Sequence, residues 1–144
     1  MRHNVILTIT SLLSILFFSF HLSDDIVRGF EPGGFKHIQG MSIMVVWLYG
    51  TLVLAGRRSG FVIILLGSLL ASLMPIAHMR GAGLVGGRVA NSGGVHFWVW
   101  TLLSLGATAP FSVILSARGL WGLPWRRRRA SDNPDLERSV EPRS

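Results

Sequence analysis

The chain has 144 residues, enough for one domain, and a formal net charge of +7. Hydrophobic residues make up 49% and charged residues only 15%, whereas a typical soluble domain carries about 25% charged residues. This composition argues against an ordinary soluble domain. The absence of cysteine excludes disulfides, iron–sulfur clusters and thiolate metal sites.

Four apolar segments, each without Asp, Glu, Lys or Arg, come close to the ~20 residues that a membrane-spanning helix needs. They predict an all-α, polytopic membrane protein whose domain, residues 1–125, is an antiparallel four-transmembrane-helix bundle. The predicted spans cover residues 5–22, 38–56, 60–79 and 95–117.

The first span could be a secretory signal, but its apolar run exceeds the 7–15 residues usual for signals. No small-residue cleavage pattern follows it, so we expect a retained helix. On a helical wheel Thr10, Ser14 and His21 share one stripe, which Asp25 continues if the helix extends past Leu22.

The second and third spans are joined by residues 57–59 only, which predicts a tight antiparallel hairpin. On the third span Gly60, Gly67 and Ala71 form a small-residue packing stripe that ends at His78. On the second span polar or small side chains share a face. The stripe on the second span comprises Gln39, Ser42, Tyr49 and Gly50. We expect the stripes of the three spans to face each other inside the bundle.

Basic residues set the expected orientation, because loops rich in Lys and Arg stay in the cytoplasm. Both termini are predicted to be cytoplasmic, in a cytoplasmic-type (inner) membrane. Residues 126–144 are expected to form a basic juxtamembrane run and a disordered cytoplasmic tail.

The basic run after the fourth span is expected to contact anionic lipid headgroups, because it lies next to the membrane boundary. We expect no nucleic-acid partner, since the basic residues of the chain flank apolar segments. The run comprises Arg126, Arg127, Arg128 and Arg129.

Histidines gather at the outer boundary of the predicted bundle. His21, His78 and His96, with Asp24 and Asp25, are the candidate ligands of a metal ion or a haem, because imidazole and carboxylate suit transition metals. Histidine also tolerates membrane boundaries without any ligand. Two further alternatives need no ligand: Asp24 as the N-cap of a short helix, and an Asp25–Arg28 ion pair.

Known catalytic patterns give little support to an enzyme. The sequence Gly81-Ala82-Gly83-Leu84-Val85-Gly86 matches GxGxxG, but it lacks the βαβ context that a dinucleotide site requires. No GxSxG, HExxH or P-loop motif is present. No carboxylate falls within a predicted span, which argues against proton-coupled transport.

The sequence therefore favours a non-enzymatic membrane protein, a structural or accessory subunit that packs in an oligomer or with other membrane proteins and lipids. The first alternative is a membrane redox subunit that binds a metal or haem through the boundary histidines. The second is a membrane-boundary enzyme that uses the His and Asp residues for acid–base catalysis.

Overall fold

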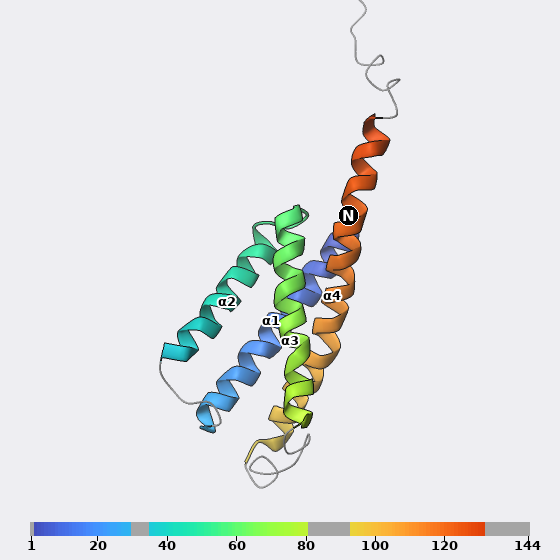
Figure 1. The fold of residues 1–144 in the computed structure, drawn as a ribbon. Coiled ribbons are helices and arrows are strands. Elements are labelled where there is room, and N and C mark those ends of the chain that lie inside the picture. The colour runs from blue at the N-terminus through green and yellow to red at the C-terminus, as the bar shows by residue number, and fades with distance from the viewer. Residues whose placement is uncertain (1, 30–34, 81–92, 132–144) are drawn as a thin grey trace, which may run out of the picture.

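The chain folds into four α-helices that run alternately up and down, with no strand in the part that the structure describes (Figure 1). This structure, a computed structural model, describes residues 2–29, 35–80 and 93–131. The all-α class predicted from the sequence is confirmed. The helices are α1 (Arg2–Val27), α2 (Phe35–Leu52), α3 (Arg58–Arg80) and α4 (Val95–Ser131).

Helix α1 extends beyond its predicted span. It continues to Val27, and the chain turns off at Gly29, whose φ of 68° lies in the left-handed region that favours glycine. Asp24 and Asp25 are therefore inside α1, and the N-cap interpretation of Asp24 is wrong.

Helix α4 also extends beyond its predicted span, because it runs on to Ser131. The basic juxtamembrane run is therefore helical, and residues 130 and 131, which were expected to be disordered, also belong to α4. Lipid contact by these arginines stays a prediction, since only their backbone is described. The residues concerned are Arg126, Arg127, Arg128 and Arg129. Residues 132–144 of the predicted tail lie outside the described residues.

Three of the helices are long and apolar enough to cross a membrane: Arg2–Val27, Arg58–His78 and Val95–Gly122. Helix α2 contributes a shorter apolar stretch, Gly40–Leu52, in place of the predicted span 38–56. It ends early because the chain turns toward α3 at Gly56, where φ is 76°.

Hydroxyl side chains within the helices bond back to their own backbone. Ser14 donates to the carbonyl of Thr10 at 2.8 Å, and Ser116 donates to that of Ser112 at 2.7 Å. This arrangement satisfies a polar group without help from water, as a lipid environment requires.

Helix α4 packs against both α1 and α3, while α2 packs against α3 and α1. The main apolar core joins all four helices, and large hydrophobic side chains also cover the outward faces of each helix. A soluble protein rarely exposes so continuous an apolar surface, which suits lipid. The buried core comprises Leu7, Ile15, Phe18, Trp47, Phe61, Ile64, Ala71, Leu105, Ala109 and Leu115.

The small-residue stripe of α3 packs closely against α2 and the turn that follows it. A Cβ added at Gly67 would lie 2.6 Å from the Trp47 side chain, and one at Gly60 would lie 2.1 Å from the Leu54 carbonyl oxygen. Ala71, farther along the stripe, is fully buried. These residues let two helices approach closely, as small residues do in membrane bundles.

The polar stripe of α1 differs in part from the expectation. Ser14 is buried but Thr10 is only half-buried, and both hydroxyls donate to carbonyl groups of their own helix. They therefore contribute no polar contact between helices.

The polar stripe of α2 also differs from the expectation. Ser42 and Tyr49 face outward, so the expected inward face is wrong for them. Helix α2 instead turns Trp47 inward, together with Gly50 and Thr51. The side chain of Gln39 lies outside the described ones.

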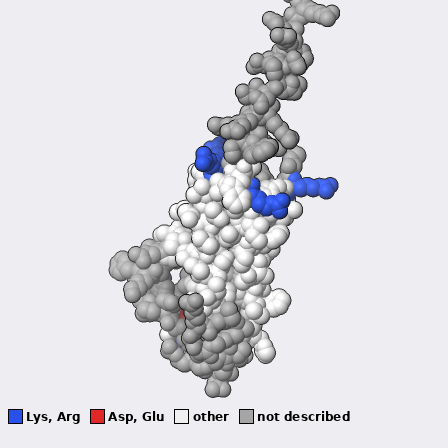
Figure 2. Space-filling model, turned by 45° about the vertical axis from the view of Figure 1, so that its right-hand side comes forward, with Lys and Arg blue, Asp and Glu red and all other residues white. Residues whose placement is uncertain are grey.

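The bundle has two distinct ends. We call the end where α1 begins and α2 turns into α3 the arginine end, because exposed arginines gather there (Figure 2). The opposite end, where α1 and α3 finish and α4 begins, is the histidine end (Figure 1). It holds the buried cluster of ionisable side chains described next.

Candidate metal centre

Three side chains from two helices converge at the histidine end. His21 and Asp25 lie one turn apart on α1, and His78 lies near the end of α3. The Nε2 atoms of both histidines are 3.5 Å from the same carboxylate oxygen, Oδ2 of Asp25. The three ligand atoms lie within 4.8 Å of one another.

Trp98 of α4 closes a further side of this cluster. Its indole N–H donates to Oδ1 of Asp25 at 2.8 Å, so the carboxylate turns its other oxygen, Oδ2, toward the histidines. The Trp98 ring lies 5.2 Å from the His21 ring and 5.3 Å from the His78 ring, measured between centroids. The cluster is thus held by three helices, although its ligand atoms come from two.

Hydrogen bonds at Nδ1 determine which nitrogen of each neutral imidazole carries the proton. Nδ1 of His78 lies 2.9 Å from the Met74 carbonyl oxygen, which can only accept, so Nδ1 is the donor. Nδ1 of His21 lies 3.4 Å from the Thr101 hydroxyl, which already donates to the Trp98 carbonyl at 3.0 Å. In both neutral rings Nε2 therefore presents a lone pair, the form that ligates a metal.

Burial makes this convergence costly if it holds no cation. The His21 side chain is 1% exposed and that of Asp25 is 6% exposed, while His78 is 26% exposed. Nε2 of His21 is buried and makes no hydrogen bond. Buried polar atoms are normally paired, and two lone pairs next to a carboxylate oxygen repel one another unless a proton or a metal cation lies between them.

The ligand set and its spacing fit a small divalent metal ion. Two imidazoles and a carboxylate are a known ligand set for zinc and for non-haem iron. Ligand atoms ~2.0–2.1 Å from a tetrahedral metal lie about 3.3 Å apart, close to the 3.5 Å between each Nε2 and Oδ2. The three side chains would fill three positions of a tetrahedral metal ion and leave the fourth open.

A haem does not fit the same residues. Axial imidazoles lie on opposite faces of a porphyrin, whereas the His21 and His78 rings meet edge to face with centroids 5.0 Å apart. Trp98 packs against both rings and occupies the adjoining space.

Asp24 does not join the cluster. Nε of Arg28 donates to Oδ2 of Asp24 at 2.6 Å, one helical turn away on α1. The expected Asp25–Arg28 pair is therefore replaced by an Asp24–Arg28 pair. Asp25 is directed inward instead, because adjacent helical residues point about 100° apart.

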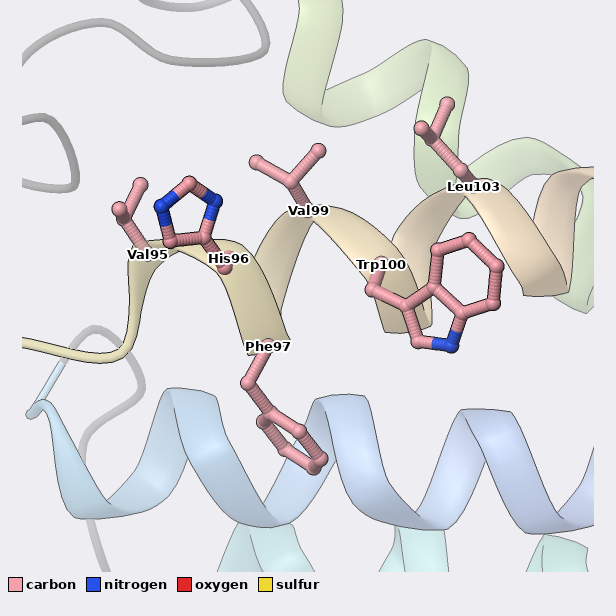
Figure 3. A pocket seen from close by; sticks show the side chains of 6 residues that line it. All are labelled: Val95, His96, Phe97, Val99, Trp100 and Leu103. Carbon is pink, nitrogen blue, oxygen red and sulfur yellow. The ribbon is translucent and has the colours of Figure 1, made fainter.

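His96 also lies apart from the cluster, exposed on α4. It lines an open hollow on the outer side of that helix together with Val99 and Trp100 (Figure 3). Of the five ligand candidates from the sequence, the structure brings together three, which are His21, Asp25 and His78.

Sequence reasoning missed the contribution of α4. Trp98 lies near the start of the predicted fourth span, yet it is buried and bonds to Asp25. Thr101, three residues later on the same helical face, is also buried. That i, i+3 spacing was the only available signal, and it does not reveal which helix the two residues face.

No family model matches the chain, and neither a curated protein nor a solved structure matches it.

Proposed function

We propose that this chain is an integral membrane protein that binds one divalent transition-metal ion through His21, Asp25 and His78. One observation carries the proposal: the Nε2 atoms of two histidines, one buried and one half-buried, each lie 3.5 Å from the same carboxylate oxygen. A charged cluster inside an apolar bundle is a functional site by default, because its burial is costly.

The surrounding bundle supports membrane insertion. Three helices have the length and apolar composition to span, and α2 is proposed to complete a four-span bundle in a cytoplasmic-type membrane. The cluster lies near the ends of α1 and α3, so its polar atoms sit close to the membrane boundary, where ionisable groups cost least. Asp25 belongs to an apolar helix of membrane-spanning length, contrary to the expectation of spans without carboxylates, because α1 is longer than predicted.

Metal content of the purified protein tests the proposal. The full chain, extracted in mild detergent, is loaded with Zn²⁺ or Co²⁺, desalted and analysed for metal per chain. We expect one ion in the wild type and loss of that ion in the His21→Ala and His78→Ala variants. The His96→Ala variant is the matched control and retains the ion, since His96 lies outside the cluster.

Two results would contradict the proposal. One is full occupancy in both cluster variants, provided that their helix content matches the wild type. The other is a wild type that binds neither ion, which would leave a proton as the occupant between the imidazoles and Asp25. Co²⁺ adds a spectroscopic check, because its visible absorption reports coordination directly.

Association with another membrane protein, the function favoured by the sequence, is the second candidate. Its support is an open groove between α2 and α3 whose lining exposes no polar surface and includes Val46, Leu66 and Gly67. Native mass spectrometry in mild detergent tests it: co-purifying subunits would support this function, and a lone chain would oppose it. Either outcome leaves the metal proposal unchanged.

A further inference from the structure

The two ends of the bundle differ in charge. Four arginines on three segments are exposed at the arginine end: Arg2 on α1, Arg57 and Arg58 at the α2–α3 turn, and Arg118 on α4. Figure 2 shows these blue side chains at one end of a broad uncharged surface. Among the described side chains, the carboxylates Asp24 and Asp25 both lie at the histidine end.

The number of basic residues, counted with the connecting segments, shows the same asymmetry between the two ends. The histidine end and the segments that leave it carry four basic residues: Arg28, Lys36, Arg80 and Arg88. The arginine end carries eight, because residues 126–129 add four arginines where α4 extends beyond the bundle. Basic residues close to helix ends are retained on the cytoplasmic side, which favours a cytoplasmic arginine end.

We infer that the metal site lies on the extracytoplasmic side of the membrane and takes up its ion from that side. This inference rests on the proposed function. It follows from the charge asymmetry of the bundle, taken together with the position of the cluster at the end opposite the exposed arginines.

The packing of the bundle also favours entry of the ion from the histidine end. On the path toward the arginine end, the bundle is filled by apolar side chains such as Phe18, Leu105 and Ala109, all buried. Hydroxyls such as those of Ser68 and Ser112 are also buried there, but the described side chains on this path offer no carboxylate to an ion that loses its hydration shell. At the histidine end, the described residues leave His78 the most exposed of the three ligands, at 26%.

The chain contains no cysteine, so a single introduced cysteine reports sidedness without background. Two exposed glycines make a matched pair, since a Cβ at Gly93 or at Gly122 meets no atom within 4 Å. Gly93 precedes α4 at the histidine end, and Gly122 lies past Arg118 at the arginine end.

The experiment uses right-side-out and inside-out vesicles from cells that express the full chain. Labelling with a membrane-impermeant maleimide should modify the Gly93→Cys variant in right-side-out vesicles and the Gly122→Cys variant in inside-out vesicles. In parallel, Co²⁺-loaded vesicles are exposed to EDTA, which does not cross membranes. Metal bound to the purified protein should fall at least tenfold after treatment of right-side-out vesicles and stay unchanged after treatment of inside-out vesicles.

The opposite pattern in either assay overturns the inference. Labelling of the Gly122→Cys variant in right-side-out vesicles would show that the arginine end faces outward. Loss of metal only from inside-out vesicles would place the site on the cytoplasmic side. Absence of bound Co²⁺ in untreated vesicles of both kinds would instead refute the proposed function, and the labelling result would stand independently.

Discussion

The arginine end and the histidine end differ in where their charged side chains lie. At the arginine end, charged side chains project outward from the helices, and among the described residues no carboxylate accompanies them. At the histidine end, Asp25 and His21 turn inward and are held by Trp98 and Thr101 of α4. The first arrangement needs only water or lipid phosphate as a partner, whereas the second places ionisable side chains next to one another inside the protein.

Because of this difference, charged residues at the two ends need different explanations. An exposed arginine at a helix end is explained by topology and by anionic headgroups alone. A buried carboxylate facing two imidazoles calls for a further explanation, because Trp98 donates to only one of its oxygens and burying a charge is costly. Substitutions at both ends test this contrast, from the largest expected effect to the smallest.

We expect Asp25→Asn to have the largest effect. An amide cannot supply the anionic ligand, and outer-sphere changes alone weaken metal binding about 10–100-fold, so affinity should fall by more than about 100-fold. Competition with a chromophoric Zn²⁺ chelator measures the change.

The neighbouring Asp24→Asn variant is the matched control for Asp25→Asn. It breaks the 2.6 Å bond to Arg28 but removes no ligand, so metal affinity should stay within about twofold of the wild type, since additive effects hold for groups without shared partners. Equal losses in the two variants would show that charge near the helix end, and not coordination by Asp25, governs binding.

At the arginine end, packing should matter more than charge. Gly60→Ala forces a methyl group to within 2.1 Å of the Leu54 carbonyl oxygen, so the hairpin must shift. We expect a loss of up to about 3 kcal/mol in the free energy of unfolding. Denaturation in mixed detergent micelles measures it, and Gly122→Ala, which has open space, should change little. Equal stability of both variants would contradict the close approach of α2 and α3.

Thr101→Val tests the outer sphere of the cluster with a near-isosteric change. It removes the acceptor for Nδ1 of His21, which frees that ring to adopt the other tautomer. We expect metal affinity to fall about tenfold, at the lower end of outer-sphere effects because the 3.4 Å bond is long. An unchanged affinity, measured by the same chelator competition, would show that Thr101 does not support metal binding.

Replacing Arg57 and Arg58 together by Gln should affect the fold least. Both side chains are exposed, so we expect the free energy of unfolding to change by about 0.5 kcal/mol or less. The preference for anionic over zwitterionic lipid should fall about fivefold per arginine, as each contributes about 1 kcal/mol near a charged surface. Retention of lipids during native mass spectrometry measures this preference. An unchanged lipid preference would show that these arginines do not bind headgroups.

Much of the fold followed from the sequence because uncharged apolar runs leave a helix few alternatives in lipid. The number of helices and the close packing of Gly67 are examples, whereas the connection between α2 and α3 covers residues 53–57 and not the expected 57–59. The ends of the helices were less predictable. Polar residues such as Asp24 and Asp25 can end a helix or continue it, and the tertiary partners of Asp25 decide between the two. The four arginines at 126–129 likewise continue α4, since arginine is a good helix former and nothing before Ser131 breaks the helix.

The sequence by itself determined the helical class, the apolar segments and the concentration of histidines and carboxylates near one boundary, because these depend on local composition and period. It also indicated that His21 and Asp25 share a helical face. Only the tertiary structure decided that His78 meets them, that Asp24 and His96 do not, and that Trp98 and Thr101 complete the cluster. Rotation of each helix about its axis sets these contacts, and that rotation depends on how all four helices pack together.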